Sequence, residues 1–242
     1  MKNLGNVLTI IPAKGTSNRI QRKNITLLAG EPLIAYTIEC AKFSGLCGEI
    51  MVSTEDLEIK KIAKACGARV PFLRPEHLSY DPYEVDDVCL YVLKQYEDTG
   101  KFFDTLIILL PTSPLRSAED INNCVRIFQK NDGKFLMSVS EMDPHYYNAL
   151  LFDQQRLSLT QFFVEDRPPK KNKPQIPVRC NGAVTIVDVK SFISAGTYYG
   201  KPLLGYEMPW ERSIDVDTDK DLMFAEFLIK SGHTTSLHAG CA

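Results

Sequence analysis

Short apolar runs alternate with helix-like segments through the first third of the chain, and this alternation most constrains its fold. The runs Leu8–Ile11, Glu49–Ser53 and Ala68–Phe72 are predicted strands. Between them, one helix is predicted from Pro32 to Gly45, and a second is expected to be capped by Thr54 and to end at Gly67. This β-α-β-α-β pattern is typical of an α/β fold with a doubly wound, mostly parallel sheet.

The alternation continues along the rest of the chain. Thr105–Leu110 is the most apolar run and a candidate central strand, because strands of a parallel sheet are buried on both faces. The stretch 141–174 is too long for a plain loop, so we interpret it as an extension that leaves the main sheet. Residues 1–232 are expected to form one domain, followed by a tail at 233–242. Further strands are predicted at Phe135–Ser140, Val178–Val187 and Ser213–Asp217, and further helices at Val85–Tyr96, after Ser117, at Asp188–Ala195 and at Leu222–Lys230.

Composition excludes several classes of protein. The 242 residues carry a formal net charge of −2, which gives no general attraction for nucleic acid or an anionic membrane. No run approaches the 18 apolar residues of a membrane-spanning helix, and no signal-peptide pattern opens the chain, so a cytoplasmic protein is expected. Seven scattered cysteines without a C-x-x-C pair predict reduced thiols rather than zinc ligands or disulfides.

The loop after the first strand has the chemistry of a phosphate site. Between Pro12 and Asn24 it contains one glycine, small residues and four cations, which offer backbone N–H donors and positive charge at the carboxyl end of a strand. The glycine spacing excludes a P-loop and a dinucleotide fingerprint. The alternative is a βα turn whose basic side chains are simply solvated.

Asp215 and Asp217 form a second candidate site. In the strand predicted at Ser213–Asp217, residues two apart point to the same face, so the two carboxylates lie side by side while Ile214 and Val216 face the core. Adjacent carboxylates near phosphates favour Mg²⁺ as their partner. The alternative is a strand end leading into a helix N-terminus, where aspartate is favoured anyway.

Five strings, in order, resemble the acylneuraminate cytidylyltransferases, the CMP-sialic acid synthetase family. The strings are IPAKGTSN followed by KN at 10–24, RP with LSYD at 74–81, LPTSPLR at 110–116, RCNGA at 179–183 and DVDT at 215–218, and together they cover the chain from Ile10 to about Lys230. The first string departs from the family's pattern at Lys14, Thr16 and Asn18. The third departs from it at Leu110, where the family has Gln.

The resemblance implies a Rossmann-like nucleotidyltransferase that joins CTP to a nine-carbon 2-keto sugar acid and releases pyrophosphate. It implies Asp215 and Asp217 as ligands of Mg²⁺, and Lys14, Lys23 and Asp217 as catalytic residues, with Asp217 a candidate to accept the proton of the attacking hydroxyl. The nucleotide-binding residues implied are Ala13, Lys14, Gly15, Ser17, Lys23, Asn24, Arg74 and Ser79. The substrate-binding residues implied are Leu110, Thr112, Ser113, Arg116, Arg179 and Asn181.

The assembly and the alternatives are also open to test. The resemblance implies a homodimer in which the extension at 141–174 reaches the partner's sugar site. Alternatives are a synthetase for another sugar acid, such as the eight-carbon Kdo, and a nucleotide-binding protein without catalysis. No role is assigned to His77 or His145, which have no partners at metal or triad spacing, and no G-x-S-x-G string suggests a hydrolase.

Overall fold

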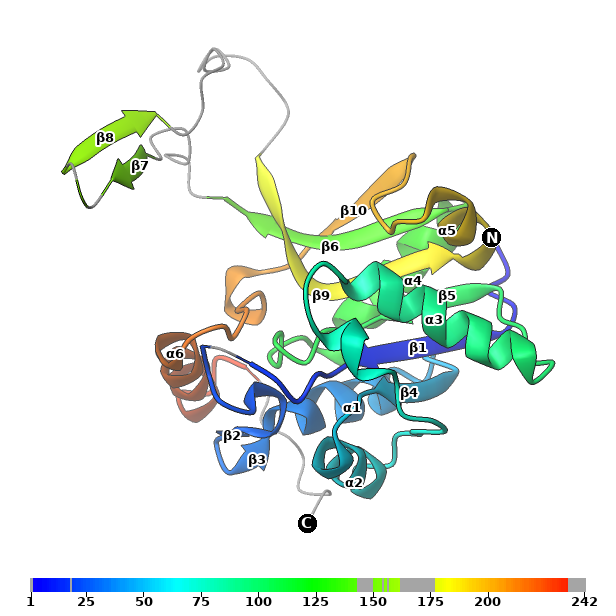
Figure 1. Cartoon of the computed structure of the whole chain (residues 1–242). Coiled ribbons are helices and arrows are strands. Elements are labelled where there is room, and N and C mark those ends of the chain that lie inside the picture. Colours follow the sequence, from blue (N-terminus) through cyan, green and yellow to red (C-terminus); the bar gives the residue numbers. More distant parts are fainter. Residues whose placement is uncertain are drawn as a thin grey trace, which may run out of the picture.

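A six-stranded sheet with helices on both faces forms the centre of the computed structural model (Figure 1), which describes residues 2–17, 19–142, 150–153, 155, 157–161 and 177–234. The strand order is β10-β6-β9-β5-β1-β4. Only β9 runs antiparallel to its neighbours β5 and β6, and the other pairs are parallel, which confirms the mixed, mostly parallel sheet. The strands are β1 (Val7–Pro12), β4 (Glu49–Ser53), β5 (Thr105–Ile108), β6 (Phe135–Glu141), β9 (Val178–Asp188) and β10 (Leu203–Glu207).

Two helical layers bury the two faces of this sheet. Apolar residues of α1, α2 and α4 share one core with the sheet, and those of α3 and α5 share the other. Helix α6 packs in a third cluster with Leu115 and Val216. Strand β1 contributes to both main cores, since Ile11 lies in one and Leu8 and Ile10 in the other. The helices are α1 (Leu33–Ser44), α2 (Leu57–Ala65), α3 (Val85–Asp98), α4 (Ala118–Lys130), α5 (Val189–Ala195) and α6 (Asp219–Lys230).

Helix boundaries follow their capping residues. The helix predicted after Ser117 begins with a capping box in which Asp120 returns the contact, and a matching box begins α6 with Thr218 and Asp221. Helix α1 begins at Leu33, directly after a two-residue strand β3 (Glu31–Pro32) that pairs with β2 (Leu27–Leu28). It ends where Gly45 adopts a left-handed conformation with φ 66°.

Two predictions in the first third are wrong. The run 68–72 forms no strand, because its contact with the sheet is a single bridge between Met51 and Arg69. Thr54 does not cap α2. The cap is Asp56, whose Oδ1 accepts from the backbone N–H groups of Glu58 and Ile59 at 2.8 and 2.9 Å.

The segment that carries Asp215 and Asp217 is not the predicted strand. A 3-10 turn, η4 (Trp210–Arg212), is followed by irregular backbone from Ser213 to Asp217. One main-chain contact links this backbone to the loop after β5: Val216 N donates to the Thr112 carbonyl at 2.7 Å. Val216 is fully buried and Ile214 is half-buried, so the expected inward direction of these two side chains holds without a strand.

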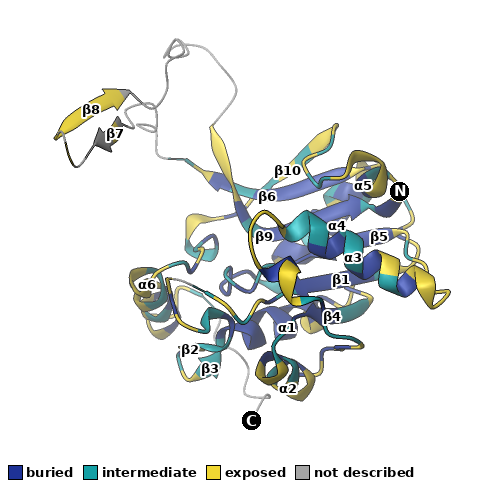
Figure 2. Cartoon of the chain, in the orientation of Figure 1, coloured by how far each residue is buried: buried dark blue, intermediate teal, exposed yellow. Residues whose placement is uncertain are grey.

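A two-stranded hairpin lies apart from the main sheet. Strands β7 (Leu150–Asp153) and β8 (Ser158–Gln161) pair with each other in a separate sheet, within the stretch interpreted as an extension (Figures 1 and 2). Most of 143–176 and the tail after 234 lie outside the described residues. Within the described part of the chain, no helix is long and apolar enough to cross a membrane. Six cysteines there are free thiols, five of them buried, as predicted.

Candidate active site

The loop after β1 is closed by its own polar groups. Its first residue, Ala13, donates its N–H to the Ser53 carbonyl at 2.9 Å, so the loop leaves β1 beside the end of β4. The buried side chain of Asn24 donates through Nδ2 to the Lys14 carbonyl at 2.8 Å. Asn24 therefore holds the two ends of the loop together, and it acts on the loop's shape rather than projecting into solvent.

Glu55 connects this loop to the one that follows β4. Its Oε1 accepts the Gly15 N–H at 2.6 Å, and its Oε2 accepts from Arg74 Nε at 3.0 Å. The buried Arg74 guanidinium also donates to Ser79 Oγ at 2.9 and 3.2 Å. Lys14 Nζ reaches the Ser79 carbonyl at 3.4 Å. Four of the predicted nucleotide residues thus belong to one connected network, and Glu55 is at its centre.

Two neighbouring cavities open between these loops at the carboxyl ends of the strands. One, of about 460 Å³, is lined by the loop after β1, which we call the basic loop, and by residues 79–81. The other, of about 340 Å³, extends to the loop after β5 and shares five lining residues with the first, which are Lys14, Lys23, Asn24, Ser79 and Asp81. Ligands of open α/β sheets bind at this edge, so the two cavities form a continuous candidate site.

The loop after β5 sends its side chains in opposite directions. Leu110 and Thr112 line the second cavity. Ser113 and Arg116 are buried behind it. Ser113 Oγ donates to the Asn181 carbonyl at 3.0 Å, and Arg116 donates to the Leu110 carbonyl and to Thr37 Oγ1. Burial lowers the pKa of Arg116 to about 10.

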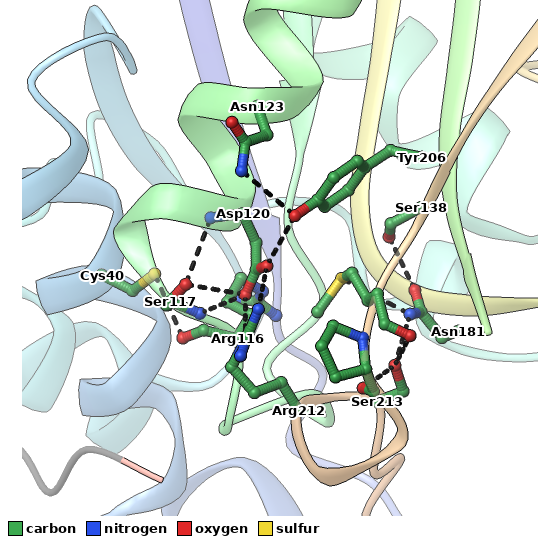
Figure 3. Close-up of polar contacts among 12 residues, drawn as sticks. Cys40, Arg116, Ser117, Asp120, Asn123, Ser138, Asn181, Tyr206, Arg212 and Ser213 are labelled. Carbon is green, nitrogen blue, oxygen red and sulfur yellow. Dashed lines mark hydrogen bonds and ion pairs between the residues drawn. The ribbon is translucent and has the colours of Figure 1, made fainter.

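Three of the predicted substrate residues are therefore placed as internal supports. Besides Ser113 and Arg116, Asn181 is buried, and its amide bonds Ser138 and Ser213 (Figure 3). Ser113 and Arg116 contact main-chain carbonyls, whereas Asn181, within β9, contacts two serine hydroxyls. Arg179, by contrast, is exposed on β9, where it pairs in register with Ser140.

Asp217 lies opposite the basic loop. Its Oδ1 accepts from Lys23 Nζ and its Oδ2 from Arg19 Nη2, both at 2.7 Å. Although partial burial favours the neutral acid, these cations hold the pKa of Asp217 below its ordinary value. An acid whose pKa is lowered is a weaker base, so the geometry does not favour Asp217 as the proton acceptor.

At Asp215, desolvation outweighs the favourable contacts, so the pKa is raised instead of lowered. The residue as a whole is exposed, yet its carboxyl is partly withdrawn from water, and this desolvation raises its pKa. The neighbouring Asp217 carboxylate adds to the rise, while a hydrogen bond with Thr112 opposes it. The raised pKa makes Asp215 the stronger base of the pair.

The donor set suits a metal that also binds phosphate. Among the described residues, no group of three or more His, Cys, Asp or Glu side chains could hold an ion alone. Mg²⁺ in nucleotide enzymes usually takes one or two carboxylates, with phosphate oxygens and water completing its shell. Asp215 and Asp217 fit that pattern, and in this structure the Asp217 carboxylate contacts Lys23 and Arg19.

Sequence reasoning missed several residues that shape this site. Glu55 and Asp56 lie in the loop after β4, and the buried Asp120 pairs with Arg212, which lies three residues before Asp215. A signal for Glu55 existed, since a charged residue just past a buried parallel strand lies at the binding edge. His77 makes an edge-on contact with the Tyr83 ring at 5.3 Å, and Asn18 and His145 lie outside the described residues.

Residues 8–158 match the cytidylyltransferase family. The CMP-N,N'-diacetyllegionaminic acid synthase of Legionella pneumophila (strain Philadelphia 1) is 36% identical over 229 residues, which cover 93% of this chain and 96% of that protein. The pseudaminic acid cytidylyltransferase of Campylobacter jejuni is 30% identical over 239 residues, which cover 98% of this chain and 100% of that protein.

A solved structure shows the same fold. The chain resembles a CMP-2-keto-3-deoxy-manno-octonic acid synthetase in complex with CTP, with a TM-score of 0.70 and 14% identity, over 94% of this chain and 99% of that one. At that identity the likeness shows the Rossmann-like nucleotidyltransferase architecture alone. Together with the family match and the two relatives, it leads to one conclusion: this chain belongs to the cytidylyltransferase family, as its resemblance to the acylneuraminate cytidylyltransferases predicts.

Proposed function

We propose that the chain joins CTP to a nine-carbon 2-keto sugar acid, giving the CMP-sugar and pyrophosphate. The observation that carries this proposal is the paired cavity that Lys14 and Lys23 both line, together with the ion pair between Lys23 and Asp217 beside it. Cations on one side and carboxylates on the other suit a polyphosphate and the metal that accompanies it. Relatives at 36% and 30% identity are named for CMP transfer to nine-carbon acids, which supports this acceptor class.

The reaction must bring two anions together. The anomeric hydroxyl of the sugar attacks the α-phosphorus in line, the P–O bond to the β-phosphate breaks, and pyrophosphate leaves with the electron pair. Lys14 and Lys23 hold the phosphates and offset the charge that develops on the leaving group. One of the two carboxylates, Asp215 or Asp217, accepts the hydroxyl proton. When bound to Asp215 and Asp217, Mg²⁺ would supply further charge neutralisation at the pyrophosphate.

The acceptor is proposed to be a relative of N-acetylneuraminate rather than that acid itself. Leu110 lines the second cavity, where the resemblance places a Gln. A side chain without an amide cannot meet a polar substituent of the sugar, and an unpaired buried polar group costs about 1–3 kcal/mol. The relative with 36% identity is named for N,N'-diacetyllegionaminic acid, which makes legionaminate the first candidate.

Pyrophosphate release tests this proposal. The full chain, CTP and Mg²⁺ are assayed with N,N'-diacetyllegionaminate, pseudaminate, N-acetylneuraminate, KDN and Kdo, and with UTP, ATP or GTP in place of CTP. We expect CTP-dependent release with a nine-carbon acid and a kcat/KM for N-acetylneuraminate about tenfold or more below that of the best acid, from the cost above. Turnover with Kdo alone would support the eight-carbon alternative. No release with any acid, despite CTP binding, would support a nucleotide-binding protein without catalysis.

The variant Leu110→Gln tests the residue behind that preference. It should improve kcat/KM for N-acetylneuraminate relative to the other acids, because the amide restores a donor and an acceptor to the pocket. The KM for CTP should not change, since the contact is with the sugar. A wild-type preference for N-acetylneuraminate that Leu110→Gln leaves unchanged would show that this position does not set the choice.

A further inference from the structure

The backbone that carries Asp215 and Asp217 has little regular structure to fix it. Between η4 and α6 it runs without strand pairing, and its main-chain link to the loop after β5 is the contact of Val216 with Thr112. Carboxylates on irregular backbone depend for their position on side-chain anchors nearby. Two such anchors stand directly before Asp215, at Arg212 and Ser213.

The first anchor is a forked ion pair. Arg212 donates to Asp120 through Nε at 2.8 Å and through Nη2 at 2.9 Å, one bond to each carboxylate oxygen (Figure 3). The Asp120 side chain is fully buried, and the Arg212 side chain is one-third exposed. A bidentate pair fixes orientation as well as distance, which a Lys contact could not do.

Asp120 is itself held rigidly. Its Oδ2 accepts from the Ser117 N–H and the Ser117 hydroxyl, both at 2.8 Å, as part of the box that begins α4. Its Oδ1 accepts from the Tyr206 hydroxyl at 3.1 Å, and Tyr206 is in turn contacted by Asn123. Burial alone would favour the neutral acid, but Arg212 and Ser117 keep the pKa of Asp120 lowered. Arg212 is therefore docked on an ionised carboxylate that cannot turn.

The second anchor is the Asn181 amide. Its Nδ2 donates to Ser213 Oγ at 3.0 Å, while its Oδ1 accepts from Ser138 Oγ at 2.6 Å and from the Ala183 N–H at 3.1 Å. Ser213 Oγ donates onward to the Pro209 carbonyl at 2.8 Å. The buried amide thus joins the centre of the sheet to the residue just before Ile214.

We propose that Asp120 and Arg212, supported by Asn181, are positioning residues that set the geometry of Asp215 and Asp217 toward the metal–pyrophosphate group. The inference rests on the proposed function. Arg212 lies three residues before Asp215, so a shift of its backbone is passed directly to both carboxylates. Displacements of about 1 Å far from the reacting atoms can cost about a hundredfold in rate.

The test measures metal binding without turnover. Mn²⁺ is titrated into the full chain with CTP and no sugar acid, and free Mn²⁺ is followed by electron paramagnetic resonance. Asp120→Asn keeps the shape of the side chain but removes the charge under Arg212, and Arg212→Lys keeps the charge but removes the fork. We expect both variants to raise the Kd of Mn²⁺ about tenfold or more, while the Kd of CTP in EDTA stays within about twofold of wild type.

Glu49→Gln is the matched control. Glu49 is a nearly buried carboxylate at the start of β4, at the opposite end of the sheet from the site, and it pairs with Lys101 and Arg69 and accepts from Tyr96. The control removes an ion-paired carboxylate, as Asp120→Asn does, and should lower Tm without changing the Kd of Mn²⁺. An equal change in Mn²⁺ affinity for Glu49→Gln and Asp120→Asn would indicate general destabilisation and overturn the inference.

A double-mutant cycle gives the second readout. If Asp120 acts through the metal carboxylates, Asp120→Asn should weaken Mn²⁺ binding no further once Asp215→Asn is present. Fully additive losses, or wild-type Mn²⁺ affinity in both Asp120→Asn and Arg212→Lys, would overturn the inference. If Asp120→Asn does not fold, Arg212→Lys carries the test alone. Failure of the wild type to bind CTP or release pyrophosphate would instead contradict the proposed function.

Discussion

Asp215 and Asp217 are two residues apart and yet have opposite electrostatic surroundings. Lys23 and Arg19 both contact Asp217 and lower its pKa despite partial burial. Desolvation and the repulsion from Asp217 raise the pKa of Asp215. Pairs of acids whose surroundings separate their pKa values often divide the work of a site. Here Asp217 makes the close contacts with Lys23 and Arg19, while Asp215 has the higher pKa of the two.

The raised pKa of Asp215 predicts that Asp215→Asn stabilises the free protein at neutral pH. An acid with a raised folded-state pKa contributes stability below its unfolded pKa of about 3.9, and this contribution is lost as pH rises through the folded value. At pH 7 the ionised carboxyl therefore destabilises the fold, and a neutral amide that can still contact Thr112 does not. We expect a higher Tm at pH 7 without divalent cations, and no gain at pH 3.5.

The same substitution should abolish pyrophosphate release, because several kcal/mol of charge stabilisation are lost, or about a thousandfold in rate. Glu49→Gln should change stability in the opposite direction. Although burial opposes ionisation of Glu49, Lys101 and Tyr96 lower its pKa. The ionised Glu49 therefore stabilises the fold above about pH 4.3, and this stabilisation is lost as pH falls through the folded-state pKa, so Glu49→Gln should lower Tm at pH 7. A lower Tm for Asp215→Asn at pH 7 would contradict the desolvation argument.

For some residues, the sequence did not predict the direction of the side chain. The strings around Ser113, Arg116 and Asn181 stand out in the sequence, but these side chains line neither cavity and turn inward to contact main-chain carbonyls and hydroxyls. Polar residues next to turns can satisfy the backbone or face a ligand, and the sequence alone does not distinguish the two. The partner of such a residue is set by tertiary contact, here with Leu110 and Ser213.

In the loop between β1 and η1 (Lys23–Ile25), we expect Gly15→Ala to weaken CTP binding and to lower stability. A Cβ at Gly15 would lie 2.7 Å from Asp56 Oδ2 and 2.9 Å from Asp56 Cβ. Asp56 cannot move freely, because it caps α2 and pairs with Arg22 at 3.0 Å. We expect the KM for CTP to rise at least severalfold and stability to fall by about 1–3 kcal/mol, the usual cost of overpacking.

Gly205→Ala in β10 is the control for that substitution. The nearest atom to a Cβ there is Val139 Cγ2 at 4.0 Å, so the added methyl group has room. Alanine in a strand interior should be neutral or slightly stabilising, and the KM for CTP should not change. Urea unfolding and CTP kinetics on both variants make the comparison. Equal kinetics for Gly15→Ala and wild type would show that this loop does not hold the nucleotide.

Helices and strands could be predicted where neighbouring residues in the sequence determine them. Apolar runs identified β1 and β4, and Ser117 with Asp120 identified the start of α4. The prediction was wrong for Ser213–Asp217, whose alternating pattern of burial arises from packing on the loop after β5 rather than from strand pairing. The antiparallel direction of β9 was also not evident, because it depends on how the preceding extension returns the chain to the sheet.

At the scale of the whole molecule, strand order assembles the site. Because β1 lies between β4 and β5, the loops after all three strands meet at one edge, bringing Lys14, Glu55 and Thr112 together although up to 98 positions separate them. The sequence predicts which strands carry polar loops, but the order that makes them neighbours follows from the packing of both faces. The strand order thus explains why three of the five short strings, at 10–24, 74–81 and 110–116, line one cavity.

The last prediction concerns assembly: the chain should be a homodimer held by the extension at 141–174. The hairpin of β7 and β8 exposes Leu151, Leu157 and Leu159 at 52%, 77% and 60% and makes no strand pairing with the main sheet in the described part of the chain. Apolar side chains that project in this way are expected to be covered by a partner. Sedimentation equilibrium at micromolar concentration should give twice the chain mass of 27.3 kDa.

Replacing Leu157 and Leu159 with serine should shift the protein toward monomer. The control is Phe102→Ser, because Phe102 is similarly exposed but is distant in sequence from the hairpin, and this variant should remain dimeric. The resemblance implies that the extension reaches the partner's sugar site, so the monomeric variant should lose sugar-acid turnover. Its Kd for CTP should remain within about twofold of wild type, because the cavity proposed to hold the nucleotide is lined by residues of this chain outside the extension. A wild-type monomer, or a monomeric variant with full turnover, would show that the extension has another role.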